Sequence, residues 1–297
     1  MLYSVKTHLT LADSPICRLC GSKRVSPLFQ QSRDGITYHI VYCPNCDLMQ
    51  TMEYLDAVSP TYVDLVESDI DKGRLWCQGE HKLPAFRQWW KLMNKYLELS
   101  TSRKADLLDV GCGTGGFLRF ARPYGFEPYG FDASQAQVDY ASKELPNIRK
   151  ALVPQDYLNN LNRRDLKFQV VTLWDALEHI RAPLEFLSQI RVILDGKGLL
   201  FVSVPNGGAI RWKQWIGHLR GKAPELIPWE HVFYFSPRSL RMCLERSGFQ
   251  VLEIGSVVCY PRTLSPFELA RRLGFLVLRF KPRWAPQIYA IARPMVM

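Results

Sequence analysis

A glycine-rich stretch, LLDVGCGTGGFLRF at residues 107–120, constrains the fold of this chain more than any other feature. Gly111, Gly113 and Gly116 have the spacing G-x-G-x-x-G, which is typical of the tight turn between a strand and a helix in a Rossmann-type unit. Such a turn lets the backbone approach a ligand closely. The stretch therefore predicts a ligand site at the end of a buried parallel strand.

From Lys104 onward the chain alternates between strand-like and helix-like segments. Runs rich in β-branched and aromatic residues predict seven strands, and apolar residues at helical spacing predict helices between them. The predicted strands cover residues 105–111, 127–132, 147–153, 168–175, 198–206, 249–258 and 287–294. The predicted helices cover residues 114–124, 134–145, 183–194 and 237–247. This order predicts an α/β fold with a doubly wound, seven-stranded, mostly parallel sheet.

Two carboxylates restrict the ligand of the glycine loop. Asp109 stands two residues before the first glycine, and Asp132 ends the second predicted strand, where a carboxylate can bind ribose hydroxyls. A buried carboxylate at Asp109 would repel the phosphates of NAD or FAD. It would complement the ammonium and sulfonium groups of S-adenosylmethionine, so we expect that compound as the ligand.

Four cysteines near the N-terminus form two C-x-x-C pairs, in CRLCGS and YCPNCDL. Each pair can place two thiolates on one turn, and the two turns together complete a tetrahedral S4 site. Four protein ligands leave no open position for chemistry, so we predict a structural Zn²⁺ on a small ribbon. The alternative is a set of cysteines that pack without a metal. The predicted ligands are Cys17, Cys20, Cys43 and Cys46.

The formal net charge of +10 favours an anionic partner, which could be nucleic acid, a phosphorylated substrate or an acidic membrane surface. The most apolar run, LGFLVLRF, is interrupted by Arg279 and is too short to span a membrane. The N-terminal residues lack the apolar stretch of a secretory signal, so we expect a cytoplasmic protein. A basic amphipathic helix predicted over residues 265–281 would either contact the inner membrane face peripherally or cover the domain's own core.

The motifs LLDVGCGTGGFL, GFDAS, QDY and WDALEHI together resemble a class I S-adenosylmethionine-dependent methyltransferase. The resemblance is to the branch of ubiquinone-type O-methyltransferases and of sugar and natural-product methyltransferases. It implies that Asp109 and the glycines line the methionine end of the cofactor, and that Asp156 lies beside the adenine. The implied cofactor-binding residues are Asp109, Gly111, Cys112, Gly113, Thr114, Gly115, Phe117, Asp132, Ala133, Ser134, Asp156, Tyr157, Trp174, Asp175 and Leu177.

Methyl transfer to a hydroxyl requires a group that takes up its proton, and a histidine has a suitable pKa near neutrality. In PWEHVFYFSPRSL, Glu230 and His231 precede a predicted helix start. Related sugar methyltransferases have a similar Glu-His element facing the acceptor. The resemblance therefore implies His231 as the base and Glu230 as its orienting partner or co-base, whereas a histidine that only braces this segment is the alternative. We expect His179 of LEHI to be structural.

The sequence predicts three regions: a zinc ribbon at 1–55, a helical linker or cap at 56–103, and a methyltransferase domain at 104–297. Acceptor-lid insertions are expected at about 207–235 and 260–286. The expected reaction is O-methylation of a sugar, a natural product or a lipid-linked acceptor. Two alternatives stay open: a ribosomal RNA base methyltransferase that uses the ribbon to bind RNA, and a non-catalytic adaptor that binds the cofactor.

Overall fold

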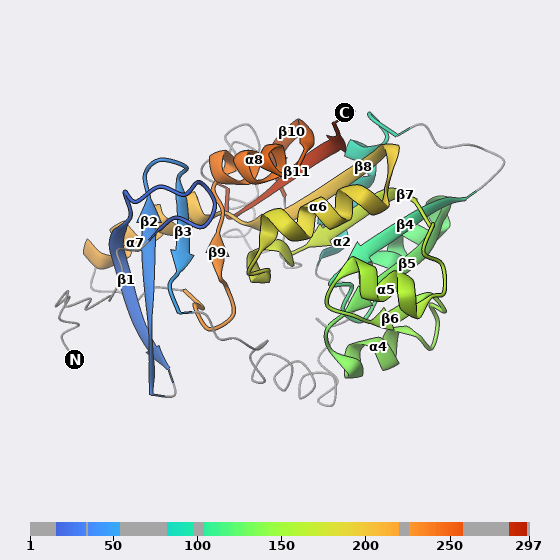
Figure 1. Ribbon diagram of the computed structural model, residues 1–297, viewed down its shortest axis with the longest axis horizontal. Helices are drawn as coiled ribbons and strands as arrows, with labels where there is room; N and C mark the ends of the chain where they lie inside the picture. The colour runs from blue at the N-terminus through green and yellow to red at the C-terminus, as the bar shows by residue number, and fades with distance from the viewer. Residues whose placement is uncertain are drawn as a thin grey trace, which may run out of the picture.

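In the computed structural model, an α/β domain and a smaller β-ribbon lie side by side (Figure 1). The structure describes residues 16–33, 35–53, 82–97, 104–219, 226–257 and 285–295, with only the backbone of residues 215–219. The amphipathic helix predicted over residues 265–281 lies outside these ranges. Within the described ranges, every helix is too short or too polar to cross a bilayer.

A seven-stranded sheet forms the α/β domain, in the order β10-β11-β8-β7-β4-β5-β6. Its strands are β4 (Ala105–Val110), β5 (Phe126–Asp132), β6 (Ile148–Lys150), β7 (Phe168–Trp174), β8 (Leu194–Pro205), β10 (Phe249–Ser256) and β11 (Gln287–Pro294). The strands from β6 to β8 pair in parallel, and β11 is antiparallel to β8 and β10. The predicted doubly wound, mostly parallel sheet is confirmed. The chain reverses its direction of winding between β4 and β7, which is where such sheets bind ligands.

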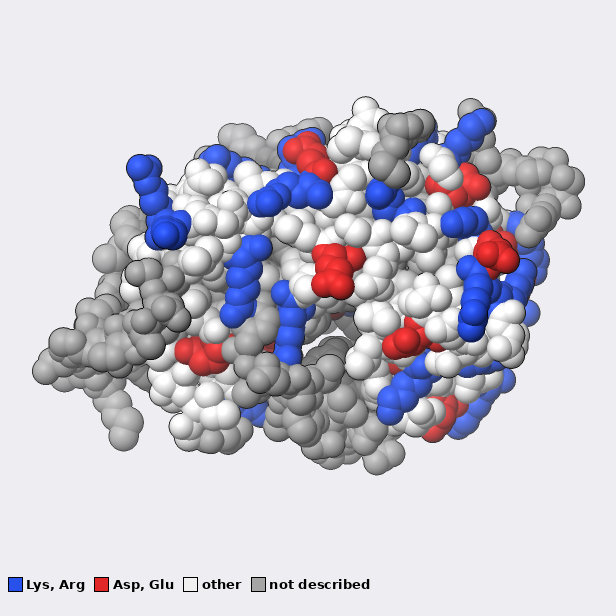
Figure 2. Space-filling model, in the orientation of Figure 1, with Lys and Arg blue, Asp and Glu red and all other residues white. Residues whose placement is uncertain are grey.

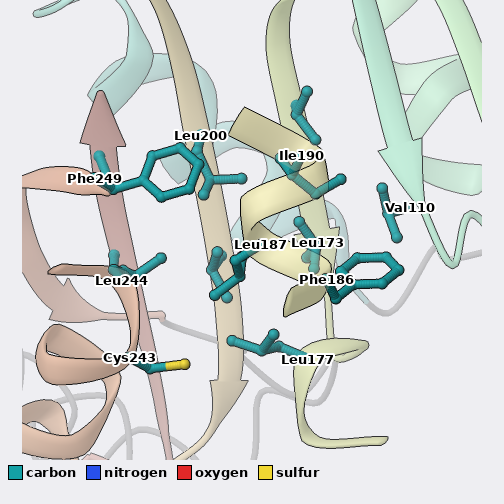
Figure 3. Close-up of a cluster of buried hydrophobic side chains, with 14 of the residues drawn as sticks. Val110, Leu173, Leu177, Phe186, Leu187, Ile190, Leu200, Cys243, Leu244 and Phe249 are labelled. Atoms are coloured by element: carbon teal, nitrogen blue, oxygen red, sulfur yellow. The ribbon is translucent and has the colours of Figure 1, made fainter. Parts of the chain in front are cut away.

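Helices cover both faces of this sheet. One face is covered by α2 (Leu83–Met93), α3 (Gly116–Ala121) with the short η3 (Arg122–Tyr124), and α4 (Gln135–Ala141). The other face is covered by α5 (Pro154–Asn160), α6 (Pro183–Ile193) and α8 (Pro237–Arg246). Figure 3 shows the core beneath α6, where apolar side chains of the helix meet those of β7 and β8. The core fixes α6, and therefore the residues at its N-terminus, against the strand ends.

The ribbon is a four-stranded antiparallel sheet in the order β1-β2-β3-β9. It contains β1 (Ser26–Arg33), β2 (Ile36–Cys43), β3 (Leu48–Thr51) and β9 (Phe233–Tyr234). The fourth strand, β9, comes from the excursion that follows β8 and α7 (Gly207–Leu219), and it pairs with β3. The buried cores of the ribbon and of α8 are also continuous. The predicted boundary near residue 55 is thus crossed by a shared sheet and a shared core.

Candidate functional site

The glycine loop after β4 has the conformation that its sequence requires. Gly111 and Gly113 have φ values of 68° and 53°, in the left-handed region that favours glycine. A Cβ atom on Gly113 would lie 2.6 Å from Oε1 of Gln137. The Asp132 carboxylate accepts hydrogen bonds from the N–H groups of Gly113 and Ser134, each at 2.9 Å. These bonds hold the loop against the end of β5.

Asp109 lies beneath this loop with 2% of its surface exposed. Thr172 Oγ1 donates a hydrogen bond to Asp109 Oδ1 over 2.7 Å. Burial raises the pKa of Asp109 to about 7, although the Thr172 bond and the charge of Lys82 act in the opposite direction. A cationic ligand would favour the ionised form of this carboxyl group.

Lys82, which immediately precedes α2, is a functional candidate that sequence reasoning missed. Its Nζ lies 2.6 Å from Asp175 Oδ2, and Gln287 Nε2 donates to Asp175 Oδ1 over 2.5 Å. Asp175 has a φ of 51°, a left-handed conformation that aspartate tolerates better than most residues. The ion pair joins residues 93 positions apart, so no local pattern in the sequence could have indicated it.

A cavity of about 660 Å³ opens at the carboxyl ends of the parallel strands. We call one wall the strand side; it includes Gly111, Asp132, Ala133, Leu152, Val153 and Asp175. We call the other wall the ribbon side; it includes Tyr38 and Glu53 of the ribbon, Trp229 and Glu230 of the segment before β9, and Arg181, Glu185 and Gln189 on α6 or just before it. Figure 2 shows a hollow between the ribbon and the α/β domain, with basic side chains along its edge. Residues from the N-terminal ribbon and from the seven-stranded sheet therefore share one cavity.

The structure brings only part of the predicted cofactor set to this cavity. Gly111, Asp132, Ala133 and Asp175 line it. Four further members lie close to these residues but outside the lining. They are Asp109, Gly113, Ser134 and Gly115, the last of which caps α3. The other buried members outside the lining are Cys112, Thr114, Phe117, Tyr157, Trp174 and Leu177, whereas Asp156 is exposed on α5. Their contacts with a cofactor stay predictions.

Glu230 and His231 differ in their relation to the cavity. Glu230 lines it, whereas His231 is outside its lining. The His231 ring lies edge-on to His179 with 4.9 Å between ring centroids, and burial together with His179 lowers the pKa of His231 to about 3. His179 lines the cavity, and its Nδ1–H donates to the Glu230 carbonyl over 2.8 Å. That bond leaves His179 Nε2 as the nitrogen able to accept a proton.

The two histidines, together with Glu178, could hold a metal ion. Ligand atoms of Glu178, His179 and His231 all lie within 4.8 Å of one another. Both carboxyl oxygens of Glu178 are buried and lack a hydrogen-bond partner among the described residues, and burial raises the pKa of this group. Two imidazoles and a carboxylate form a donor set that zinc and other divalent transition metals accept.

The four ribbon cysteines lie together at the predicted site. Cys17 Sγ is 3.4 Å from Cys46 Sγ, Cys20 Sγ is 3.6 Å from Cys43 Sγ, and all four sulfurs lie within 4.8 Å of one another. Zn–S bonds of about 2.3 Å at tetrahedral angles place sulfurs about 3.8 Å apart. The set therefore fits a tetrahedral Zn²⁺ ion, and it is separate from the residues that line the cavity.

Comparison with known proteins agrees with this geometry. Residues 81–254 match the family described as "Methyltransferase domain". The chain is 24% identical over 225 residues to the Ubiquinone biosynthesis O-methyltransferase of Coxiella burnetii (strain RSA 331), with 70% of this chain and 94% of that protein covered. The Bartonella tribocorum protein of the same name is 26% identical over 160 residues, covering 50% and 62%.

Among solved structures, the complex between the Haloferax volcanii Trm112 methyltransferase activator and the putative methyltransferase matches with a TM-score of 0.52. The match covers 78% of this chain and 98% of that chain, at 17% sequence identity. At that identity, the likeness concerns the fold alone.

Proposed function

The chain belongs to the methyltransferase domain family and is an S-adenosylmethionine-dependent methyltransferase, and on that premise we propose that it methylates a hydroxyl group of a small-molecule acceptor. S-adenosylmethionine, when bound, supplies an electrophilic methyl group. The protein has to align the acceptor and take up the hydroxyl proton. Similarity to a Ubiquinone biosynthesis O-methyltransferase supports oxygen as the methylated atom.

We assign the donor to the strand side of the cavity. Asp132 would bind the ribose hydroxyls, and the carboxylates of Asp109 and Asp175 would face the cationic groups of the donor. Lys82 would bind the donor's own carboxylate, because it is a cation placed beside Asp175. The proposal is supported by the glycine loop, which lets a ligand approach the ends of β4 and β5.

We assign proton uptake to Glu230, with His179 and His231 holding it in position. The observation that carries this assignment is that Glu230 lines the same cavity as Gly111 and Asp132. For His231 to act as the base, as the sequence predicted, its ring would have to turn into the cavity.

We also propose that the ribbon holds a structural Zn²⁺ ion. The four sulfurs leave no coordination position for substrate, so the metal would stabilise the ribbon and take no part in the transfer.

A transfer assay with radiolabelled S-adenosylmethionine against fractionated cell glycans, lipids and RNA would identify the acceptor. With that acceptor, Glu230→Gln should lower turnover by roughly 10²- to 10⁴-fold and leave the donor affinity unchanged in calorimetry. Glu245→Gln is the matched control, since Glu245 is an exposed carboxylate on α8 outside the cavity.

Wild-type turnover by Glu230→Gln would disprove the assignment of the base. Labelling of RNA, with binding that weakens steeply as salt rises, would favour the RNA methyltransferase instead. Donor binding without transfer to any fraction would favour the adaptor.

A further inference from the structure

The ribbon side of the cavity combines an aromatic ring with several hydrogen-bonding groups. Resting on the function proposed above, we propose that this wall binds a polyhydroxylated ring, of the sugar class, stacked on Trp229. The hydroxyl to be methylated would point from this ring toward the strand side.

Trp229 is held as a rigid platform. Tyr38 of β2 meets its ring edge-on, with 6.3 Å between centroids and an interplanar angle of 66°. Arg33 of β1 places its guanidinium carbon 4.6 Å from the Trp229 ring centroid. Trp229 and Tyr38 line the cavity, whereas Arg33 is outside the lining, so we take Arg33 to cover the ring on its side away from the cavity. The opposite face is then available to the apolar C–H face of a sugar.

The groups around this platform suit hydroxyl partners. Gln189 Oε1 is buried and has no hydrogen-bond partner among the described residues, although Gln189 lines the cavity. Such an acceptor calls for a donor from a ligand or from water. Glu185 adds carboxylate oxygens, and Arg181 adds N–H donors. A hydroxyl both donates and accepts, so a polyol can bond to all three side chains.

Glu53, on the same wall, is held in place by the ribbon. Its two oxygens accept from His39, one from Nδ1 at 2.5 Å and one from the backbone N–H at 2.6 Å. Each carboxylate oxygen still has a free lone pair for a further donor. The ribbon therefore contributes both a ring-stacking face and an oriented acceptor.

Other acceptor classes fit this wall less well. The phosphates of RNA would be repelled by Glu53, Glu185 and Glu230, which all line the cavity. A long apolar chain would cover Gln189 Oε1 without offering it a hydrogen-bond donor, which is unfavourable for a buried polar atom. A sugar has an apolar face for the indole and a polar rim for the acids, so it matches both features.

Saturation-transfer NMR on the full-length, zinc-loaded protein with S-adenosylhomocysteine tests this inference. The probes are a panel of free hexoses and deoxyhexoses, a prenylated phenol and a short RNA oligonucleotide. We expect saturation of the ring C–H protons of at least one monosaccharide, loss of that signal in Trp229→Ala and a weakened signal in Gln189→Leu.

Trp212→Ala is the matched control, because Trp212 is 44% exposed and outside the cavity lining. That variant should keep the signal. Calorimetry with S-adenosylmethionine shows whether each variant is folded.

The inference is overturned if no monosaccharide is saturated, if the sugar signal survives Trp229→Ala, or if only the prenylated phenol or the RNA depends on Trp229. This experiment measures binding and not methyl transfer. Its result can therefore be interpreted even if the Glu230→Gln assay disproves the assignment of the base. Sugar binding can thus stand or fall separately from the assignment of the base.

Discussion

At the scale of single residues, Asp109 links donor recognition to pH. Burial raises its pKa to about 7, so the group is largely protonated in slightly acidic solution. A protonated carboxyl attracts a cation less than a carboxylate does. The affinity for S-adenosylmethionine should therefore rise by up to about tenfold per pH unit from about pH 5.5 to about pH 7 and then level off. Calorimetry at constant ionic strength measures this profile.

Asp109→Asn is the informative control for that profile. Its amide oxygen can still accept the Thr172 hydrogen bond, whereas its charge no longer changes with pH. The variant should bind the donor more weakly, with a flat profile over the same range. An unchanged profile would instead point to Asp132, whose pKa burial also raises.

The same pKa shift predicts how the stability of the donor-free protein depends on pH. The folded-state pKa of about 7 exceeds the value of 3.8 for an aspartate in water, so the folded state retains a proton that the unfolded state has released. The free energy of unfolding should then fall as the pH rises from about 4 to about 7. Asp109→Asn removes this penalty, so its melting temperature at pH 8 should exceed that of the wild type in calorimetry. A lower melting temperature at pH 8 would contradict the assignment.

At the scale of elements, the sequence predicted those helices and strands whose residue pattern lies within the element itself, and it missed those that depend on distant contacts or lack a pattern. The strands β4 to β8 and the glycine loop were predictable, because apolar runs and turn residues mark them directly. The helix α5 was missed because its sequence, PQDYLNN, has its two large apolar residues, Tyr157 and Leu158, side by side and so shows no helical periodicity. The two-residue strand β9 was missed because its partner β3 lies about 180 residues earlier in the chain. The contact of Glu230 with the cavity was predictable only through the family resemblance.

The contact between β3 and β9 leads to a prediction about the ribbon. Thr51 donates from Oγ1 to the His231 carbonyl over 2.8 Å and from its N–H to the Val232 carbonyl over 2.9 Å. Thr51→Val keeps the shape but leaves the first carbonyl without its donor, which costs about 1–3 kcal/mol of stability in a buried site. Because Glu230 adjoins His231, turnover should fall while donor affinity stays the same.

Thr51→Ser retains the hydroxyl and serves as the matched control. Chemical denaturation and calorimetry with S-adenosylmethionine compare the two variants. Equal turnover in both would show that this hydrogen bond does not position the Glu230 segment.

At the scale of the whole molecule, the ribbon and the α/β domain form one functional unit. The cysteine cluster, β3 and the core next to α8 belong to one buried network. Strand β9, which begins three residues after Glu230, pairs with β3 and so connects the Glu230 segment to that network. The strand side of the cavity is built from the glycine loop and the ends of β4 and β5, whose apolar residues belong to the same network. The part of the facing wall that comes from Tyr38, Glu53 and the segment before β9 depends on the ribbon strands, which the glycine loop does not use.

This division predicts the effect of removing the metal. A four-cysteine ribbon owes much of its folding free energy to bound Zn²⁺, so a chelator or Cys43→Ser should unfold it and release β9. Methyl transfer should then be lost, whereas S-adenosylmethionine should still bind within a few-fold of its original affinity, because its site lies on the strand side. Calorimetry, transfer assays and elemental analysis before and after re-addition of Zn²⁺ measure these effects. Full transfer activity in verified metal-free protein would show that the ribbon wall forms without the ion, and equal loss of donor binding would show that the two walls fold together.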